Sequence, residues 1–283
     1  MHRDGTRNFS RREVLAAGLA GVATLGLAGR PARARVAAPA GEYGPFKLGL
    51  QSYSLRHYKT AEALAKTKEL GLHYWESYSA HTNISPAKAS EYKAMASAAG
   101  VEVIGFGVSS FTKDHDANRK IFEFGKAMGV GYLSADPTTD AFDSLDKLTE
   151  EYGIAIGIHP HGPKARWQKI DQIFGAIKDH SDKIGVCNDT GHFLRSNEDP
   201  VRAVEVFGKR TYGVHLKDVK DATTFTILGE GDLKLAELMK ALAKINYSYC
   251  VALEYEESES NPIPDIEKCL AAVRKAAATL DKA

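Results

Sequence analysis

The feature that most constrains the fold is a regular alternation of short apolar runs and longer stretches with helical patterning, which begins near Phe46. Eight apolar runs have the length of strands, at residues 47–53, 74–78, 101–108, 132–135, 154–159, 184–189, 212–216 and 249–255. Helical patterning follows each of them, at 61–70, 86–99, 117–128, 142–152, 170–180, 201–207, 235–245 and 263–280. Glycine or asparagine comes after several of these stretches, as expected where a helix ends in a left-handed residue.

Eight strand–helix units in about 240 residues have the size and rhythm of a (β/α)8 TIM barrel. The alternative is an open, doubly wound sheet, which often has a glycine-rich nucleotide-binding turn after its first strand. Here the first strand ends in Gln51-Ser52-Tyr53-Ser54, without such a turn. We therefore predict a single-domain TIM barrel over residues 46–283, preceded by an N-terminal extension at 35–45.

The first 34 residues have a different character. Arg11 and Arg12 precede an uncharged, Ala/Gly/Leu-rich run that ends at Gly29, and "RPARA" at 30–34 has the small-x-small pattern of a cleavage site. This arrangement resembles a twin-arginine (Tat) export signal. The apolar run is shorter than the roughly 20 residues that span a bilayer. We expect residues 1–34 to be a signal peptide, the protein to be periplasmic, and no stable membrane insertion.

The charge balance argues against nucleic acid as a partner. The chain has 37 basic and 36 acidic residues, and residues 1–34 hold six of the former and two of the latter, which leaves 31 and 34. A net charge of about −3 gives no basic surface for DNA. Cys187, Cys250 and Cys269 are too few for a disulfide framework, and whether any two pair is left open, as is the oligomeric state.

In the second half of the chain, four predicted strands end in polar residues that alternate with apolar ones. In the fifth strand, "IAIGIHPH", the isoleucines alternate with His159 and His161. Because helices cover the outside of a barrel, the isoleucines should face outward and the imidazoles should face the axis. The same alternation turns a set of residues inward at the ends of the next three strands: Asp189, His215, Lys217 and Glu254.

Imidazoles and carboxylates that are buried side by side are costly unless they are paired or coordinated. Their nitrogen and oxygen atoms suit one divalent metal ion such as Mn, Zn, Co or Mg. We therefore predict a metal site at this mouth of the barrel. For Asp189 alone, within "CNDTGHF", the alternative is a cap on the following helix.

Five motifs in order, "HPHG", "DTGH", "VHLKD", "LGEGDL" and "ALEYE", make the chain similar to the xylose isomerase-like barrel superfamily, whose members are often named sugar phosphate isomerases or epimerases. The segments "LGLQSYSLR" at 48–56 and "WES" at 75–77 resemble the first two strands of that family. The resemblance covers residues 46–280 and implies a small carbohydrate substrate.

The resemblance also implies roles for individual residues. The metal would be held by one residue from each of the last four strands: His159, Asp189, His215 and Glu254. His192 would contact substrate oxygens, and Glu76 and Trp75 would line the pocket. Many family members have glutamate at the position of His159, so this chain retains only Glu254 of the pair of glutamates that exchange protons in the family's epimerases. Some dehydratases of the superfamily have E-x-H at this strand, which makes His161 the candidate for a second base.

The expected chemistry is removal of a proton next to a carbonyl, giving an enediolate that the metal stabilises. Glu254 or His161 would be the base, and Lys217 would donate to the developing oxyanion unless it forms a salt bridge with Asp218 or Glu230. Reprotonation gives isomerisation or epimerisation, our first prediction. Beta-elimination by a lyase or dehydratase is the alternative, and a sugar-binding barrel without turnover is another. The superfamily's endonuclease branch is disfavoured by the charge.

Overall fold

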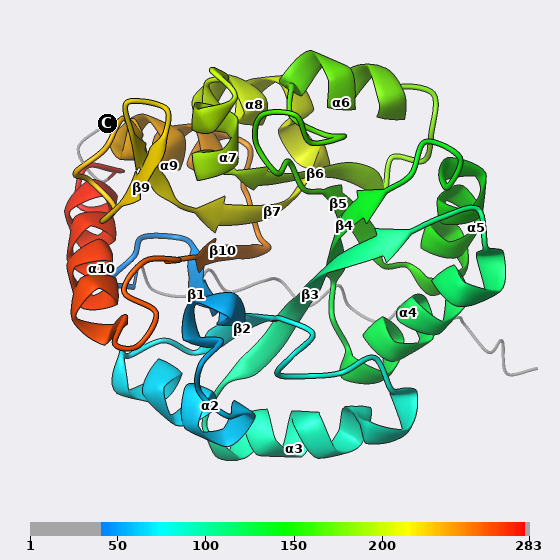
Figure 1. The fold of residues 1–283 in the computed structure, drawn as a ribbon, viewed down its shortest axis with the longest axis horizontal. Coiled ribbons are helices and arrows are strands. Elements are labelled where there is room, and N and C mark those ends of the chain that lie inside the picture. The colour runs from blue at the N-terminus through cyan, green and yellow to red at the C-terminus, as the bar shows by residue number, and fades with distance from the viewer. Residues whose placement is uncertain (1–40, 281–283) are drawn as a thin grey trace, which may run out of the picture. The chain divides into compact units, whose positions relative to one another are not determined.

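The computed structural model describes residues 41–280, which form a closed barrel of eight parallel strands inside a ring of helices (Figure 1). In the sheet the strands follow the order β1-β10-β7-β6-β5-β4-β3-β2. Their bounds are β1 Lys47–Gln51, β2 Tyr74–Ser77, β3 Glu102–Phe111, β4 Tyr132–Pro137, β5 Ala155–Ile158, β6 Ile184–Asp189, β7 Thr211–Leu216 and β10 Cys250–Leu253. The predicted single-domain (β/α)8 barrel is confirmed.

Helices connect successive strands and cover the outside of the barrel. The α-helices are α2 Thr60–Glu69, α3 Ala89–Ala98, α4 His115–Met128, α5 Phe142–Tyr152, α6 Ile170–Ile177, α7 Thr190–Arg195, α8 Pro200–Phe207, α9 Leu235–Lys244 and α10 Ile263–Ala277. Short 3-10 helices are η1 Ser52–Leu55, η2 Pro86–Lys88 and η3 Gly208–Arg210. Gly129 and Gly153 end α4 and α5 in the left-handed conformation, which glycine adopts without a steric penalty.

The alternation of side chains along the strands divides the core into two clusters. Ile156 and Ile158 of β5 belong to the large cluster between strands and helices, as the parity of "IAIGIHPH" predicts. Ala155 belongs to a separate small cluster with Tyr132, Tyr212, Cys250 and Ala252. Small residues on the inward parity leave room for the Tyr132 ring, since a Cβ atom at Gly105 would overlap it. The barrel interior above this layer is therefore free for polar side chains.

After β7 the chain forms a small antiparallel hairpin, β8 Asp218–Lys220 and β9 Thr224–Thr226. The sequence pattern did not predict these two short strands. Buried Asp218 anchors the segment, because its carboxylate accepts hydrogen bonds from the backbone N–H groups of Val219, Gly229, Gly231 and Leu233. The hairpin begins one residue after β7 and is thereby fixed beside α7.

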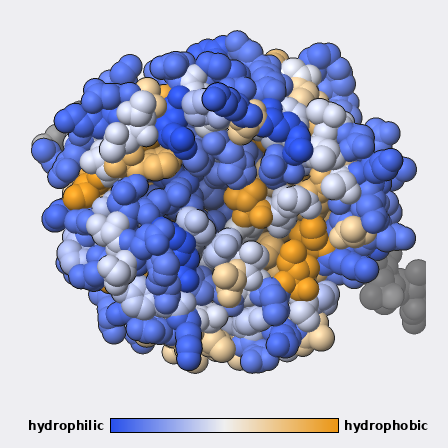
Figure 2. Space-filling model, viewed as in Figure 1, coloured by the Kyte–Doolittle hydropathy of each residue, from blue (hydrophilic) through white to orange (hydrophobic). Residues whose placement is uncertain are grey.

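The predicted export signal at 1–34 and most of the extension at 35–45 lie outside the described residues. Within residues 41–280, no helix is both long enough and apolar enough to cross a bilayer. Cys187, Cys250 and Cys269 are all buried and free, without a disulfide between them. The side of the molecule drawn in Figure 2 is largely hydrophilic, with small apolar patches.

Candidate functional site

The four predicted metal ligands meet at one mouth of the barrel. His159 directly follows β5, Asp189 ends β6, His215 lies in β7 and Glu254 directly follows β10. Each offers one ligand atom, these atoms lie within 4.8 Å of one another, and all four residues are buried. Three strands are hydrogen-bonded neighbours in register, with Asp189 opposite His215 and His215 opposite Ala252, two residues before Glu254. β5 pairs with β6 as well, with Ile158 opposite Val186. Strand pairing therefore fixes the four side chains relative to one another.

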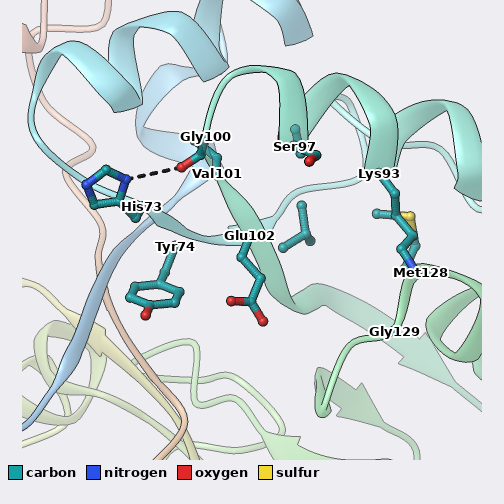
Figure 3. A pocket seen from close by; sticks show the side chains of 11 residues that line it. His73, Tyr74, Lys93, Ser97, Gly100, Val101, Glu102, Met128 and Gly129 are labelled. Atoms are coloured by element: carbon teal, nitrogen blue, oxygen red, sulfur yellow. Dashed lines mark hydrogen bonds between the residues drawn. The ribbon is translucent and has the colours of Figure 1, made fainter. Parts of the chain in front are cut away.

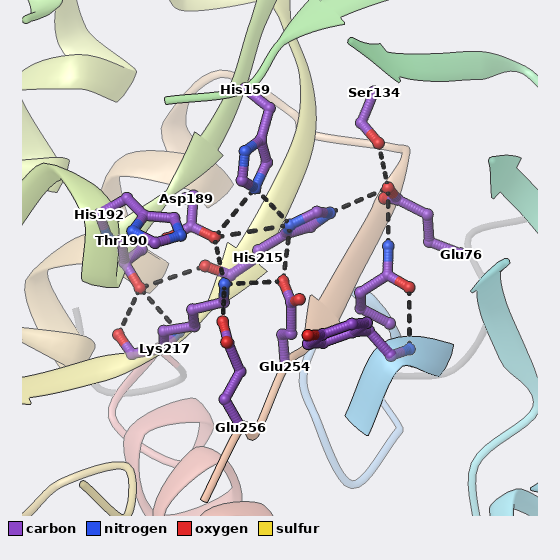
Figure 4. Close-up of polar contacts among 12 residues, drawn as sticks. Glu76, Ser134, His159, Asp189, Thr190, His192, His215, Lys217, Glu254 and Glu256 are labelled. Atoms are coloured by element: carbon purple, nitrogen blue, oxygen red, sulfur yellow. Dashed lines mark hydrogen bonds and ion pairs between the residues drawn. The ribbon is translucent and has the colours of Figure 1, made fainter. Parts of the chain in front are cut away.

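Short distances join the four side chains (Figure 4). His159 Nε2 lies 3.1 Å from Asp189 Oδ2 and 3.0 Å from His215 Nδ1. His215 Nδ1 in turn lies 2.9 Å from Glu254 Oε2 and 3.6 Å from Asp189 Oδ2. Two imidazole nitrogens and two carboxylate oxygens thus point at one small volume.

The chemistry of this donor set fits a divalent cation. Nitrogen and carboxylate oxygen are the ligands that Zn, Co, Mn and Fe take in proteins. Glu254 Oε2 is buried and accepts no well-aligned hydrogen bond, although it faces the other three residues. A bound cation would satisfy this oxygen, so the four residues could hold a metal.

Lys217 supplies positive charge to the same site. Its Nζ atom lies 3.1 Å from Asp189 Oδ2 and 3.1 Å from Glu254 Oε2, and it donates a hydrogen bond to Glu256 Oε1. Its ion pairs are therefore with these carboxylates and not with the Asp218 or Glu230 that the sequence offered. Burial acts to lower the pKa of Lys217, but the three carboxylates outweigh it and hold the pKa above its ordinary value.

The same charges keep the acids of the site ionised. Burial acts to raise the pKa of Glu254, but Lys217 and His215 outweigh it and lower the pKa to about 2. The pKa of Asp189 is likewise held well below its usual range, because Lys217 and His192 outweigh burial. Ionised carboxylates are what a metal ligand requires.

A cavity of about 260 Å³ opens above the cluster. His159, Lys217 and Glu254 form part of its wall, together with His161 and His192. The His161 ring lies 4.5 Å from that of His159 and 5.8 Å from that of His192, measured between centroids. Burial lowers the pKa of His192 to about 4, so this imidazole is neutral at pH 7 and can accept a hydrogen bond. The remaining lining residues are Gln51, Tyr53, Tyr78, Gly107, Val108 and Glu256.

Comparison with known families identifies the barrel. The family described as xylose isomerase-like TIM barrel matches residues 64–276, which is more than half of the chain. The chain belongs to the xylose isomerase-like TIM barrel family.

Curated relatives of this xylose isomerase-like barrel include inosose dehydratases. That of Clostridium botulinum (strain Eklund 17B / Type B) is 30% identical over 144 residues, which cover 43% of this chain and 47% of the dehydratase. That of Clostridium beijerinckii is 26% identical over 139 residues, 42% of this chain and 46% of the dehydratase. The chain spans about half the length of the curated relatives it matches.

Solved structures share the architecture over most of the chain. The 3-keto-D-glucoside 4-epimerase of E. coli has a TM-score of 0.66 at 16% identity, covering 81% of this chain and 99% of the epimerase. An uncharacterised protein of Parabacteroides distasonis has a TM-score of 0.64 at 25% identity, covering 81% and 98%. A D-psicose 3-epimerase has a TM-score of 0.62 at 17% identity, covering 83% and 98%. At such identities the likeness shows the xylose isomerase-like fold.

The two residues expected to line the pocket from β2 lie elsewhere in the xylose isomerase-like barrel. Trp75 is fully buried on the outer side of β2, where its Nε1 donates to Thr67 Oγ1 at 3.0 Å and its ring stacks on His81. Glu76 points inward but is 0% exposed and beneath the cavity, with its Oε1 atom 2.9 Å from His215 Nε2. The structure does not bring either side chain to the cavity wall.

Some cavity residues were not predicted. Glu256 shares the inward parity of Glu254, so the rule that found Glu254 could have found it. Gln51 ends β1, and its inward direction could have been read from the same alternation. Tyr53 and Tyr78 follow β1 and β2 in connecting segments, where no periodicity indicates their direction.

A second cavity of about 460 Å³ lies at the opposite end of the strands (Figure 3). It is lined by residues that precede or begin strands, among them His73, Tyr74 and Glu102, and by parts of α3 and α4. The His73 ring contacts the Gly100 carbonyl at 3.1 Å. Active sites of TIM barrels lie at the carboxyl ends of the strands, so this cavity is not the candidate active site.

Proposed function

We propose that this barrel is a divalent-metal-dependent sugar isomerase or epimerase that removes a proton next to the carbonyl of a small carbohydrate. The observation that carries the proposal is the convergence of His159, Asp189, His215 and Glu254 at the floor of a cavity whose wall holds further imidazoles. A metal bound there would polarise the carbonyl and stabilise negative charge on the adjacent oxygen. Solved relatives named as epimerases support this class of reaction.

Metal binding, proton removal and substrate binding are assigned to different residues of this chain. Glu254 has a pKa of about 2, which suits a permanent ligand better than a base at neutral pH. His161 is exposed at the cavity wall and close to the His159 ring, so it is the group best positioned to take the proton. His192 is neutral and accepts a hydrogen bond from a substrate hydroxyl.

Lys217 remains a cation among three carboxylates, and it is one of the residues that line the cavity. An ammonium in this position donates a hydrogen bond to the oxygen that becomes negative as the proton leaves. Lys217 thus orients the carbonyl end of the substrate, while His161 acts on the neighbouring carbon.

Beta-elimination is the second candidate. Loss of a hydroxyl from the carbon next to the carbanion needs a proton donor as well as a base. His161 can be both, because the proton that it takes from carbon can be returned to the leaving hydroxyl, and its ring lies 5.8 Å from the neutral His192 ring on the same wall. The relatives named as inosose dehydratases carry out a reaction of this type. The early steps are shared, so the two candidates differ only in the fate of the carbanion.

The test is metal analysis of the purified protein, followed by incubation with ketoses, inososes and 3-keto-glycosides in heavy water. Deuterium in recovered substrate establishes proton removal, a new stereoisomer indicates epimerisation, and an enone with loss of water indicates elimination. His215→Ala is the matched control, and it should lose metal and exchange together. Tight ligand binding without deuterium incorporation would instead indicate a sugar-binding barrel, and absence of metal from active protein would contradict the metal role.

We further propose that the protein is exported to the periplasm through the Tat route, on the basis of the twin arginine at Arg11 and Arg12. Cell fractionation of the wild type and of a variant with both arginines changed to lysine tests this. Periplasmic activity should disappear in the variant.

A further inference from the structure

The carboxylate of Glu76 lies next to His215, on the opposite side of this ring from Asp189 (Figure 4). Its side chain is 0% exposed. Oε1 accepts hydrogen bonds from Gln51 Nε2 at 3.1 Å and Ser134 Oγ at 2.5 Å, and Oε2 accepts one from the Tyr132 hydroxyl. These donors come from β1, which pairs with β2, and from β4, which is separated from β2 by β3. The carboxylate is therefore held in a built site and has no direct path to the substrate.

A buried carboxylate is costly unless hydrogen bonds and an opposite charge compensate it. The three donors are neutral, and burial with the nearby Glu76 charge raises the pKa of Tyr132 well above its ordinary value, so that it remains a donor. The remaining contact is with His215, whose Nε2 lies 2.9 Å from Oε1. That nitrogen is buried and has no well-aligned hydrogen-bond partner, so its close contact is this ion pair with the Glu76 carboxylate.

The His215 ring thus lies between the clustered residues on one side and Glu76 on the other. Its Nδ1 faces the cluster, 2.9 Å from Glu254 Oε2, and its Nε2 faces Glu76. A neutral imidazole that coordinates a cation through Nδ1 must hold its proton on Nε2, and the group that faces Nε2 selects this tautomer.

We propose that Glu76 is a positioning residue that holds the proton of His215 on Nε2 and fixes the ring so that the Nδ1 lone pair faces the metal. This inference rests on the proposed metal centre. The glutamate of "WES" would then orient a metal ligand and would not contact the substrate.

Glu76, Cys187 and His215 also have the spacing of a metal site of their own. The Glu76 oxygens, however, already accept three hydrogen bonds, and burial raises the pKa of the Cys187 thiol to about 12. A protonated thiol is a poor ligand. The group is therefore better explained as support for His215.

The test compares the wild type with Glu76→Gln, which removes the charge and keeps the shape, and with Ser134→Ala, which removes one hydrogen bond and keeps the carboxylate. Zinc affinity is measured on metal-free protein by competition with a chelator, and the cobalt-loaded proteins are compared by visible absorption. We expect Glu76→Gln to weaken zinc binding by about 10- to 100-fold and to change the cobalt spectrum. Ser134→Ala should change both much less. A purely structural role would lower the melting temperature without altering the cobalt spectrum of folded protein.

Equal zinc affinity and an identical cobalt spectrum in folded Glu76→Gln would overturn the inference and leave the proposed function standing. A wild type that binds no divalent metal would overturn both. Should Glu76→Gln not fold, ¹⁵N NMR of the zinc-loaded wild type decides the matter. The inference requires the His215 proton on Nε2, and a proton on Nδ1 would refute it.

Discussion

Asp189 accepts a hydrogen bond from the backbone N–H of His192 through Oδ1 at 2.8 Å, while its Oδ2 lies 3.1 Å from His159 Nε2. One carboxylate therefore caps α7 and joins the cluster at the mouth of the barrel. The two interpretations of "CNDTGHF" are compatible because each uses a different oxygen. The cap also carries His192 to the cavity wall, since it fixes the first turn of α7.

The two tasks of Asp189 can be separated by mutation. Asparagine caps a helix about as well as aspartate but has no charge. Alanine has neither a charge nor a side-chain oxygen that can cap the helix. We expect Asp189→Asn and Asp189→Ala both to weaken metal binding by tenfold or more. Asp189→Ala should unfold more easily than Asp189→Asn by about 1 kcal/mol, the usual value of a cap. Chelator competition and urea unfolding of the metal-free variants provide the two measurements, and equal stabilities would contradict the capping role.

Lys217 and a bound metal cation should each neutralise part of the negative charge of the carboxylates at the site. In the metal-free protein, removing the ammonium leaves Asp189, Glu254 and Glu256 without their shared counter-ion. Lys217→Met should then lower the free energy of unfolding by about 3–5 kcal/mol, as for other broken buried pairs. Metal supplies positive charge to two of the same carboxylates. The decrease in the free energy of unfolding caused by Lys217→Met should therefore be smaller in metal-loaded protein. Thermal unfolding with and without metal measures the two decreases in stability. Equal decreases in metal-free and metal-loaded protein would show that the metal does not compensate for Lys217.

Strand parity predicted which residues face the barrel axis, because the two-residue period of a strand is visible in a single run such as "IAIGIHPH". Parity does not give depth. Glu76 faces inward like Glu254, yet it lies beneath the cavity, because the stagger between strands sets how far each residue is from the mouth. Trp75, its neighbour in sequence, must face the opposite way and packs against α2.

The hairpin β8–β9 could not be predicted for a different reason. Its strands have three residues each, too few to show a period, and its position depends on Asp218. The sequence suggested Asp218 only as a partner for Lys217, whereas its carboxylate binds four backbone N–H groups of its own loop. Such local hydrogen bonds leave no pattern in the order of residue types.

His81 should make the barrel sensitive to acid. Burial lowers the pKa of His81, whose ring contacts Ser52 Oγ at 2.9 Å and the Tyr58 carbonyl at 3.1 Å. Between the lowered folded pKa and about 6.5, the unfolded chain binds more protons, so stability falls as the pH falls through this window and is constant above it. The loss is about 1.4 kcal/mol for each unit by which the pKa is lowered.

Replacing His81 with glutamine should flatten this part of the stability curve, because glutamine does not titrate. His73→Gln is the matched control for the substitution itself, since that ring is exposed. Urea unfolding of metal-free protein from pH 4.5 to 7.5 measures the slope. A slope that His81→Gln leaves as steep as in the wild type would show that other groups cause it.

His159 should determine which metal the site prefers. Two imidazoles and two carboxylates favour Zn or Co over the harder ions Mn and Mg, which prefer oxygen ligands. His159→Glu replaces one nitrogen donor with oxygen at the same strand end, so the ratio of Mn affinity to Zn affinity should rise by at least about tenfold, or 1.4 kcal/mol. His192→Gln is the control, because His192 lies on the cavity wall outside the cluster. Competition between the two metals, followed by elemental analysis, measures the ratio, and an unchanged ratio in folded His159→Glu would exclude His159 as a ligand.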